Sequence, residues 1–204
     1  MKAVILAAGL GSRLRPLTND KPKALIKVCG KPILEYQIES YLKAGLREED
    51  IAIVVGYKAI YIKYFCEEKF PGVKLVENNQ YLTTNNMYSL FIYLKEFFLR
   101  QNLKDDLIVS NGDCIYELSI VSKLVETKGT CIVCDTSFFS EESMKVKVDK
   151  NGRVVKISKE IPKEDSFATS IDLYKFTYDA VMNLWLIIND FVKKNDTNKW
   201  TEEA

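Results

Sequence analysis

The chain has 204 residues and a formal net charge of +1, and 47% of its residues are hydrophobic and 28% charged. This composition is typical of a globular protein with one large domain, and the near-zero net charge argues against a protein that coats nucleic acid. The sequence contains no histidine, which excludes histidine-based acid–base catalysis and histidine metal ligands.

The cellular compartment is predicted from three features. No apolar run is long enough to span a membrane, and the first strand begins directly after Lys2 without a signal peptide. The five cysteines lie mostly in or beside apolar segments, which favours a reducing compartment. Cys131 and Cys134 are three residues apart on a predicted strand and so lie on opposite faces, which favours buried thiols over a metal or redox site. We expect a cytoplasmic protein with no membrane or nucleic-acid partner.

Strand-like and helix-like segments alternate along the first half of the chain. We expect strands at 3–7, 51–55, 73–76 and 106–110 and helices at 32–44, 60–70, 87–98 and 117–125. This alternation predicts parallel strands joined by right-handed crossovers. In the second half we expect strands at 130–135, 145–149, 153–158 and 167–176 and a helix at 178–194, with Asn151-Gly152 at the centre of a hairpin turn. The predicted fold is α/β, with a mainly parallel central sheet, a small β-hairpin addition and one domain over residues 1–204.

A glycine-rich loop, Ala8-Gly9-Leu10-Gly11-Ser12-Arg13, follows the first strand. Its glycines allow a tight turn and a close approach to a ligand, and successive backbone N–H groups can bind an anion. Six lysines and arginines against Asp20 alone lie between residues 9 and 31, which favours a polyphosphate over a glycine turn with solvated lysines. A Walker A loop would need Gly-Lys-Ser/Thr, and a dinucleotide loop would need a third glycine at Leu14.

Residues 6–18, LAAGLGSRLRPLT, followed by PKAL at 22–25 and GKPIL at 30–34, resemble the signature of the nucleotidyltransferase family. The resemblance implies a Rossmann-like three-layer fold and transfer of a nucleotidyl group with release of pyrophosphate. It also implies that Arg13 and Lys23 hold the β and γ phosphates. An acceptor phosphate is already largely ionised at neutral pH, so the reaction needs no general base.

Residues 77–90, ENNQYLTTNNMYSL, contain more asparagines than turns and helix caps require, which suggests hydrogen bonds to a polar ligand. The segment is similar to cytidylyltransferase members that act on small non-sugar phosphates, which implies CTP as the donor. The implied acceptor is phosphoglutamine, giving CDP-glutamine in capsule or surface polysaccharide modification, with phosphocholine or a sugar-1-phosphate as alternatives. Together the two motifs imply nucleotide contacts from Leu6, Ala7, Ala8, Gly9, Gly11, Ser12, Asn78, Tyr81, Asn85, Tyr88 and Ser89.

Asp113 directly follows the strand predicted at 106–110, where open α/β sheets bind ligands. By resemblance Asp113 binds Mg²⁺, which takes one or two carboxylates together with phosphate oxygens; capping of the next helix is the alternative role. Lys159 is implied to bind the acceptor phosphate, with a solvated loop charge as the alternative. The resemblance also implies a second metal-binding aspartate after a tryptophan segment like residues 199–203. We therefore expect the chain to lack a C-terminal segment that carries this aspartate, and Glu202 or Glu203 could take the place of the aspartate. A nucleotide-binding domain that has lost catalysis is therefore the hypothesis from another class.

Overall fold

The computed structural model describes residues 1–99 and 104–203. Residues 100–103 and Ala204, the last residue of the predicted domain, lie outside the described residues. The helices are α1 (Ile33–Lys43), α2 (Ala59–Lys69), α3 (Asn86–Tyr93, continued by a π-helical turn over Leu94–Leu99), α4 (Leu118–Glu126) and α5 (Tyr178–Lys193). The strands are β1 (Lys2–Ala7), β2 (Lys27–Val28), β3 (Lys31–Pro32), β4 (Ile51–Val55), β5 (Lys74–Glu77), β6 (Leu107–Asn111), β7 (Cys131–Asp135), β8 (Lys145–Val148), β9 (Val154–Ser158) and β10 (Ala168–Phe176).

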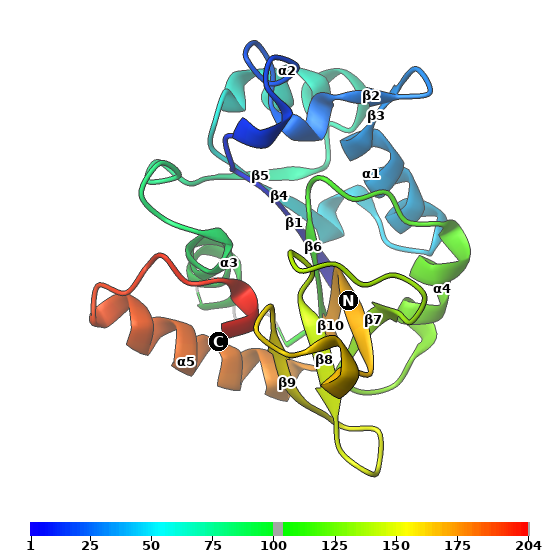
Figure 1. The fold of residues 1–204 in the computed structure, drawn as a ribbon. Helices are drawn as coiled ribbons and strands as arrows, with labels where there is room; N and C mark the ends of the chain where they lie inside the picture. The colour runs from blue at the N-terminus through cyan, green and yellow to red at the C-terminus, as the bar shows by residue number, and fades with distance from the viewer. Residues whose placement is uncertain (100–103, 204) are drawn as a thin grey trace.

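The central sheet has the strand order β5-β4-β1-β6-β10-β8-β9, with β7 paired to β10. Strands β5, β4, β1 and β6 are parallel, whereas β10 runs antiparallel to β6. The chain adds β4 and then β5 on one side of β1 and returns to the other side as β6 (Figure 1). The strand order thus reverses between β1 and β6, and the carboxyl ends of strands at such a point form a crevice suited to ligands.

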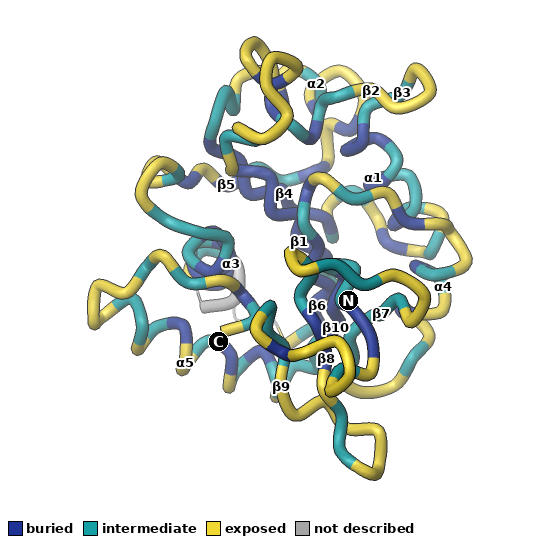
Figure 2. Tube along the Cα trace, viewed as in Figure 1, coloured by how far each residue is buried: buried dark blue, intermediate teal, exposed yellow. Residues whose placement is uncertain are grey.

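The helices cover both faces of the sheet because the central strands are apolar on both sides. In β1, Ala3, Ile5 and Ala7 pack in one core cluster with α1, α2 and α4, while Val4 and Leu6 pack in the other with α3 and α5. Figure 1 shows these helices on opposite sides of the sheet, and Figure 2 shows β1 and β4 as buried. The alternation follows from the two-residue period of a strand.

The structure confirms the predicted α/β fold, its parallel sheet and its hairpin. The hairpin joins β8 to β9 through the turn at Asn151 and Gly152, where Gly152 has a φ of +76°. The two-stranded β2–β3 ribbon was not predicted, because two-residue strands carry no periodicity. Pro32 ends β3 and caps α1, so the helix begins one residue later than predicted. No helix among the described residues is both long enough and apolar enough to cross a membrane.

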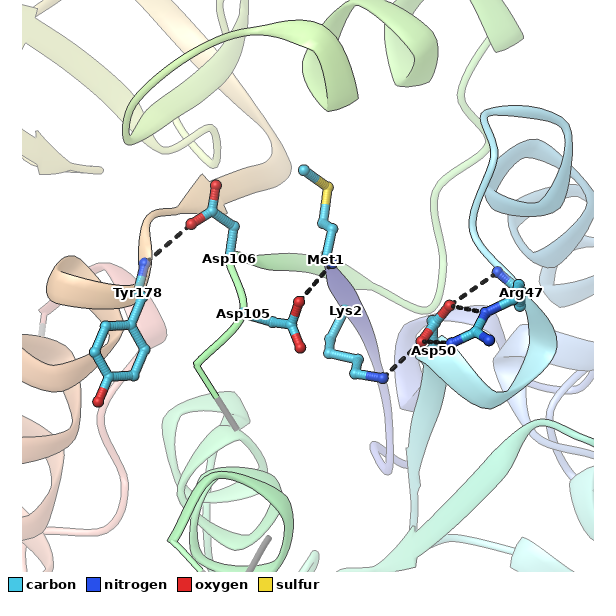
Figure 3. Close-up of polar contacts among 7 residues, drawn as sticks. All are labelled: Met1, Lys2, Arg47, Asp50, Asp105, Asp106 and Tyr178. Atoms are coloured by element: carbon cyan, nitrogen blue, oxygen red, sulfur yellow. Dashed lines mark hydrogen bonds and ion pairs between the residues drawn. The ribbon is translucent and has the colours of Figure 1, made fainter. Parts of the chain in front are cut away.

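Polar contacts fasten the amino end of the central strands (Figure 3). The N-terminal ammonium group pairs with Asp105 at 2.7 Å, and Lys2 pairs with Asp50 at 2.6 Å. Asp50 also accepts hydrogen bonds from the side chain of Arg47, which is the main reason that its pKa lies below the usual range. These contacts lie at the end of β1 opposite the glycine-rich loop, and they hold the strand that carries this loop.

Candidate active site

A pocket of about 300 Å³ opens where β1 and β6 end, at the reversal of strand order. The loops that follow β1, β5 and β6 line it, together with Trp200 near the C-terminus. Most of the predicted site residues meet there, although they are spread over more than a hundred positions. The predicted residues that line the pocket are Leu6, Ala7, Ala8, Gly9, Gly11, Ser12, Arg13, Lys23, Asn78, Tyr81, Asn85, Ser89 and Asp113.

The glycine-rich loop has the geometry that an anion site requires. Gly11 has a φ of +62°, and a Cβ there would lie 3.0 Å from a methyl group of Thr18, so only glycine fits without strain. The Thr18 hydroxyl donates to the Gly11 carbonyl at 2.9 Å and holds the loop closed. Within the described chain the backbone N–H groups of Gly9, Leu10 and Gly11 donate no hydrogen bond. These free N–H groups at the rim of the pocket can donate hydrogen bonds to phosphate oxygens.

Lys23 and Asp113 form an ion pair across the pocket. The Lys23 side chain is 28% exposed and that of Asp113 35% exposed, so both groups are within reach of a ligand. A triphosphate with its metal ion offers each group a new partner, an anion for the ammonium and a cation for the carboxylate. The helix that follows Asp113 is capped at Glu117 without a side-chain bond, so the alternative role of Asp113 as a helix cap is wrong.

The asparagines after β5 brace the pocket wall. Asn78 is 1% exposed; its amide nitrogen donates to Ser89 at 3.1 Å and to Thr84 at 3.2 Å, and its oxygen accepts from the Gln80 N–H. Asn85 caps α3 through its side-chain oxygen. Local bonds therefore account for much of the asparagine excess that the sequence suggested was for a ligand.

Two predicted residues do not line the pocket. Tyr88 stacks on Phe91, with ring centroids 5.6 Å apart. Lys159 pairs with Glu142 at 3.2 Å, and its Nζ lies 5.1 Å from the centre of the Trp200 ring. Trp200 is part of the pocket wall, so Lys159 lies next to the pocket without lining it.

Two acidic side chains lie near Asp113: Glu202, which the sequence offered as a substitute metal ligand, and Asp172, which the sequence analysis missed. Asp172 lies at a bulge of β10 with a φ of +59°. Burial, followed by the nearby Glu202 carboxylate, raises the pKa of Asp172 to about 6. Glu202 accepts a hydrogen bond of 2.6 Å from the Tyr174 hydroxyl. Glu203 instead accepts bonds from Trp200 and Lys199 and takes no part in this group.

The donor set suits a metal ion that arrives with a phosphate ligand. No group of three or more acidic or cysteine side chains that could hold a metal occurs among the described residues. Of the residues that the structure describes, Asp113 alone presents a carboxylate to the pocket. Mg²⁺ commonly binds through one or two carboxylates, with phosphate oxygens and water as its other ligands. The residues fit Mg²⁺ bound together with a nucleotide.

Other residues that sequence reasoning missed line the pocket beside the predicted ones. These are Leu14, Ala24, Thr84, Asn86, Asn111, Gly112 and Trp200. Several directly neighbour predicted residues, so sequence adjacency could have indicated them. Trp200 lies in the tryptophan segment that the sequence indicated near a metal ligand, but its place in the pocket wall depends on the packing of the last described turn, where the Thr201 N–H donates to the Asn86 side-chain oxygen at 2.9 Å.

Comparisons with known proteins point to one family. The sequence model described as nucleotidyl transferase matches residues 2–200. The chain is 35% identical over 191 residues to a CTP:phosphoglutamine cytidylyltransferase of Campylobacter jejuni, a match that covers 87% of this chain and 74% of that protein. It is 51% identical over 96 residues to a choline-phosphate cytidylyltransferase of Streptococcus pneumoniae, which covers 47% of this chain and only 40% of that protein. The solved structure of CTP:phosphocholine cytidylyltransferase from Streptococcus pneumoniae superposes with a TM-score of 0.74 and 28% identity, over 99% of this chain and 82% of that one.

Proposed function

This chain belongs to the nucleotidyl transferase family, and we propose that it is a cytidylyltransferase that joins CMP from CTP to a small phosphorylated acceptor. The family resemblance expected from residues 6–34 is confirmed by the match over residues 2–200. The observation that carries the proposed activity is the pocket at the end of β1 and β6, which brings the free N–H groups of the glycine-rich loop together with Lys23 and Asp113.

In the proposed reaction an oxygen of the acceptor phosphate attacks the α-phosphorus of CTP. A new P–O bond forms, the bond from the α-phosphorus to the β-phosphate oxygen breaks, and pyrophosphate leaves with that electron pair. The acceptor phosphate has its second pKa near 6 and is largely ionised at neutral pH, so the chain has no proton to remove. This agrees with a sequence that contains no histidine.

The residues of the pocket then position the phosphates and neutralise charge. The loop N–H groups would bind the phosphate oxygens, and Arg13 and Lys23 would hold the β and γ phosphates as charge develops on pyrophosphate. Asp113 would hold Mg²⁺, which when bound neutralises phosphate oxygens. Lys159 is our candidate for the acceptor phosphate, which requires it to leave Glu142. Holding two reactants in line contributes much of the rate enhancement in such reactions.

We propose phosphoglutamine as the acceptor, because the relative named for it matches over most of this chain. Phosphocholine is the second candidate, supported by the higher identity over a shorter stretch and by the structural similarity. A role in capsule or surface polysaccharide modification stays a prediction.

The test is release of pyrophosphate from CTP and Mg²⁺, with phosphoglutamine, phosphocholine or glucose-1-phosphate offered in separate reactions. We expect release with one acceptor and none from an Asp113→Ala variant. Release in the variant at the parent rate would contradict the assigned role of Asp113. Binding of CTP without release in any reaction would instead favour a nucleotide-binding domain that has lost catalysis.

A further inference from the structure

Helix α1 buries a glutamine beneath the pocket. Gln37 is 1% exposed, and its amide nitrogen donates to the carbonyl oxygens of Asn111 at 2.7 Å and of Cys114 at 2.6 Å. These two residues stand on either side of Gly112 and Asp113 in the turn that leaves β6. One side chain, 74 positions from Asn111 in the sequence, therefore clamps the backbone that carries the carboxylate of the pocket.

Packing alone does not explain a glutamine at this place. Both donors of its NH₂ group are used by the two carbonyls. Its oxygen Oε1 is buried and accepts no hydrogen bond from the described residues. A buried acceptor without a partner destabilises a fold, and an apolar side chain of the same length would fill the space without this penalty. The two bonds to the turn are the interaction that an apolar side chain cannot supply.

The opposite side of the turn is held equally closely. The Gly112 N–H donates to the Leu6 carbonyl at 2.8 Å, and a Cβ at Gly112 would lie 2.7 Å from the Cβ of Ala7. The turn is therefore fixed between the end of β1 and the Gln37 amide. Asp113 has little freedom in its backbone, and its carboxylate is directed into the pocket beside Lys23.

We propose that Gln37 is a positioning residue that orients the Asp113 carboxylate toward the metal ion of the nucleotide. This inference rests on the proposed function, in which Asp113 holds that ion. Gln37 acts through the two carbonyls and touches neither nucleotide nor acceptor. Loss of an outer partner of a metal-binding group typically lowers metal affinity or activity by 10- to 100-fold. We therefore expect loss of the Gln37 amide to weaken metal binding by about 10-fold or more.

The test compares Gln37→Met with Tyr41→Phe. Methionine has a similar length but no donor, so Gln37→Met removes the clamp and keeps the packing. Tyr41 lies on the same helix and donates to the Ser110 hydroxyl at 2.8 Å, so Tyr41→Phe also removes a bond between α1 and this segment, but outside the Asp113 turn. The measurement is the dissociation constant of Mn²⁺ from electron paramagnetic resonance, with the unreactive analogue α,β-methylene-CTP bound. We expect about 10-fold weaker Mn²⁺ binding in Gln37→Met, the parent value in Tyr41→Phe, and unchanged affinity for the analogue in EDTA.

An unchanged Mn²⁺ dissociation constant in folded Gln37→Met overturns the inference, as does equal weakening in Tyr41→Phe. If Gln37→Met does not fold, Gln37→Asn takes its place, because asparagine keeps the amide but is too short to reach both carbonyls. An Mn²⁺ affinity equal to that of the parent in Gln37→Asn likewise overturns the inference. Asp113→Ala separates the two hypotheses. Parent-like Mn²⁺ binding in Asp113→Ala contradicts the metal site of the proposed function, whereas loss of binding there with no change in Gln37→Met rejects the role of Gln37 alone.

Discussion

We expect the Lys23→Ala variant to fold nearly as well as the parent chain and to lose most of its turnover. The ion pair with Asp113 is the main contact that the substitution removes, and both side chains are about one-third exposed. Pairs with this access to water contribute at most about 1 kcal/mol to folding. For a chain of this size, that corresponds to a melting temperature lower by about 2–4 °C.

The expected effect on catalysis is larger. In the proposed function Lys23 stabilises charge on the departing pyrophosphate, and removal of one preorganised contact of this kind typically slows a reaction by about a hundredfold or more. A hundredfold corresponds to about 2.7 kcal/mol, more than twice the largest effect that we expect on folding. The two measurements therefore separate a catalytic role from a structural one.

The assay is pyrophosphate release at saturating CTP, with thermal unfolding followed by circular dichroism. Lys27→Ala is the matched control, because Lys27 is an exposed cation of the same segment that does not line the pocket. We expect parent-like turnover in this control. A melting temperature lower by more than about 10 °C in Lys23→Ala would indicate a structural role, and unchanged turnover would refute its contact with the phosphates.

Three further predictions concern folding, and urea unfolding checks each of them. Gly112→Ala should lower the free energy of unfolding by about 1–3 kcal/mol, because its Cβ would lie 2.7 Å from a side chain of β1, whereas Gly9→Ala, whose Cβ meets nothing within 4 Å, should change it little. Asp50→Asn should destabilise the protein by about 2 kcal/mol at pH 7; since Arg47 holds the pKa of Asp50 low, this difference should shrink as the pH falls below about 4. Asp172→Asn should stabilise the metal-free protein by up to about 2 kcal/mol at pH 7. The pKa of Asp172 is raised to about 6 in the folded protein, so its ionisation lowers the free energy of unfolding as the pH rises through that value. Equal stability of parent and variant at pH 7 would contradict this prediction.

The regular elements could be predicted because their signals are local. In β4 all five residues are buried, and its predicted bounds are those observed. The Asn151-Gly152 turn indicated the β8–β9 hairpin from two residues. The place of β10 between β6 and β8 could not be predicted, because pairing between distant strands leaves no periodic trace in either of them.

The site residues that belong to a sequence motif could be predicted, whereas those that tertiary packing brings to the pocket could not. The glycine-rich loop and Asp113 each follow a buried strand directly, so their meeting at the sheet edge follows from parallel topology. Gln37 and Asp172 act across long sequence separations and belong to no motif. Gln37 did carry one signal, a polar residue beside Ile38 on the core-facing side of an amphipathic helix, which indicates a buried hydrogen bond.

The charge of the segment from residue 9 to residue 31 shows how well a count of charged residues along the sequence predicts which of them line a site. Only Arg13 and Lys23 of its six cations line the pocket. Lys31 pairs with Glu39 at 3.0 Å, and Lys27 is exposed on the β2–β3 ribbon. The local excess of cations therefore indicated the right segment, although only two of these six cations lie where they could contact a phosphate. In the proposed function, two cations, the free loop N–H groups and one carboxylate would bind the phosphates, and this small set would suit a triphosphate that brings its own metal ion.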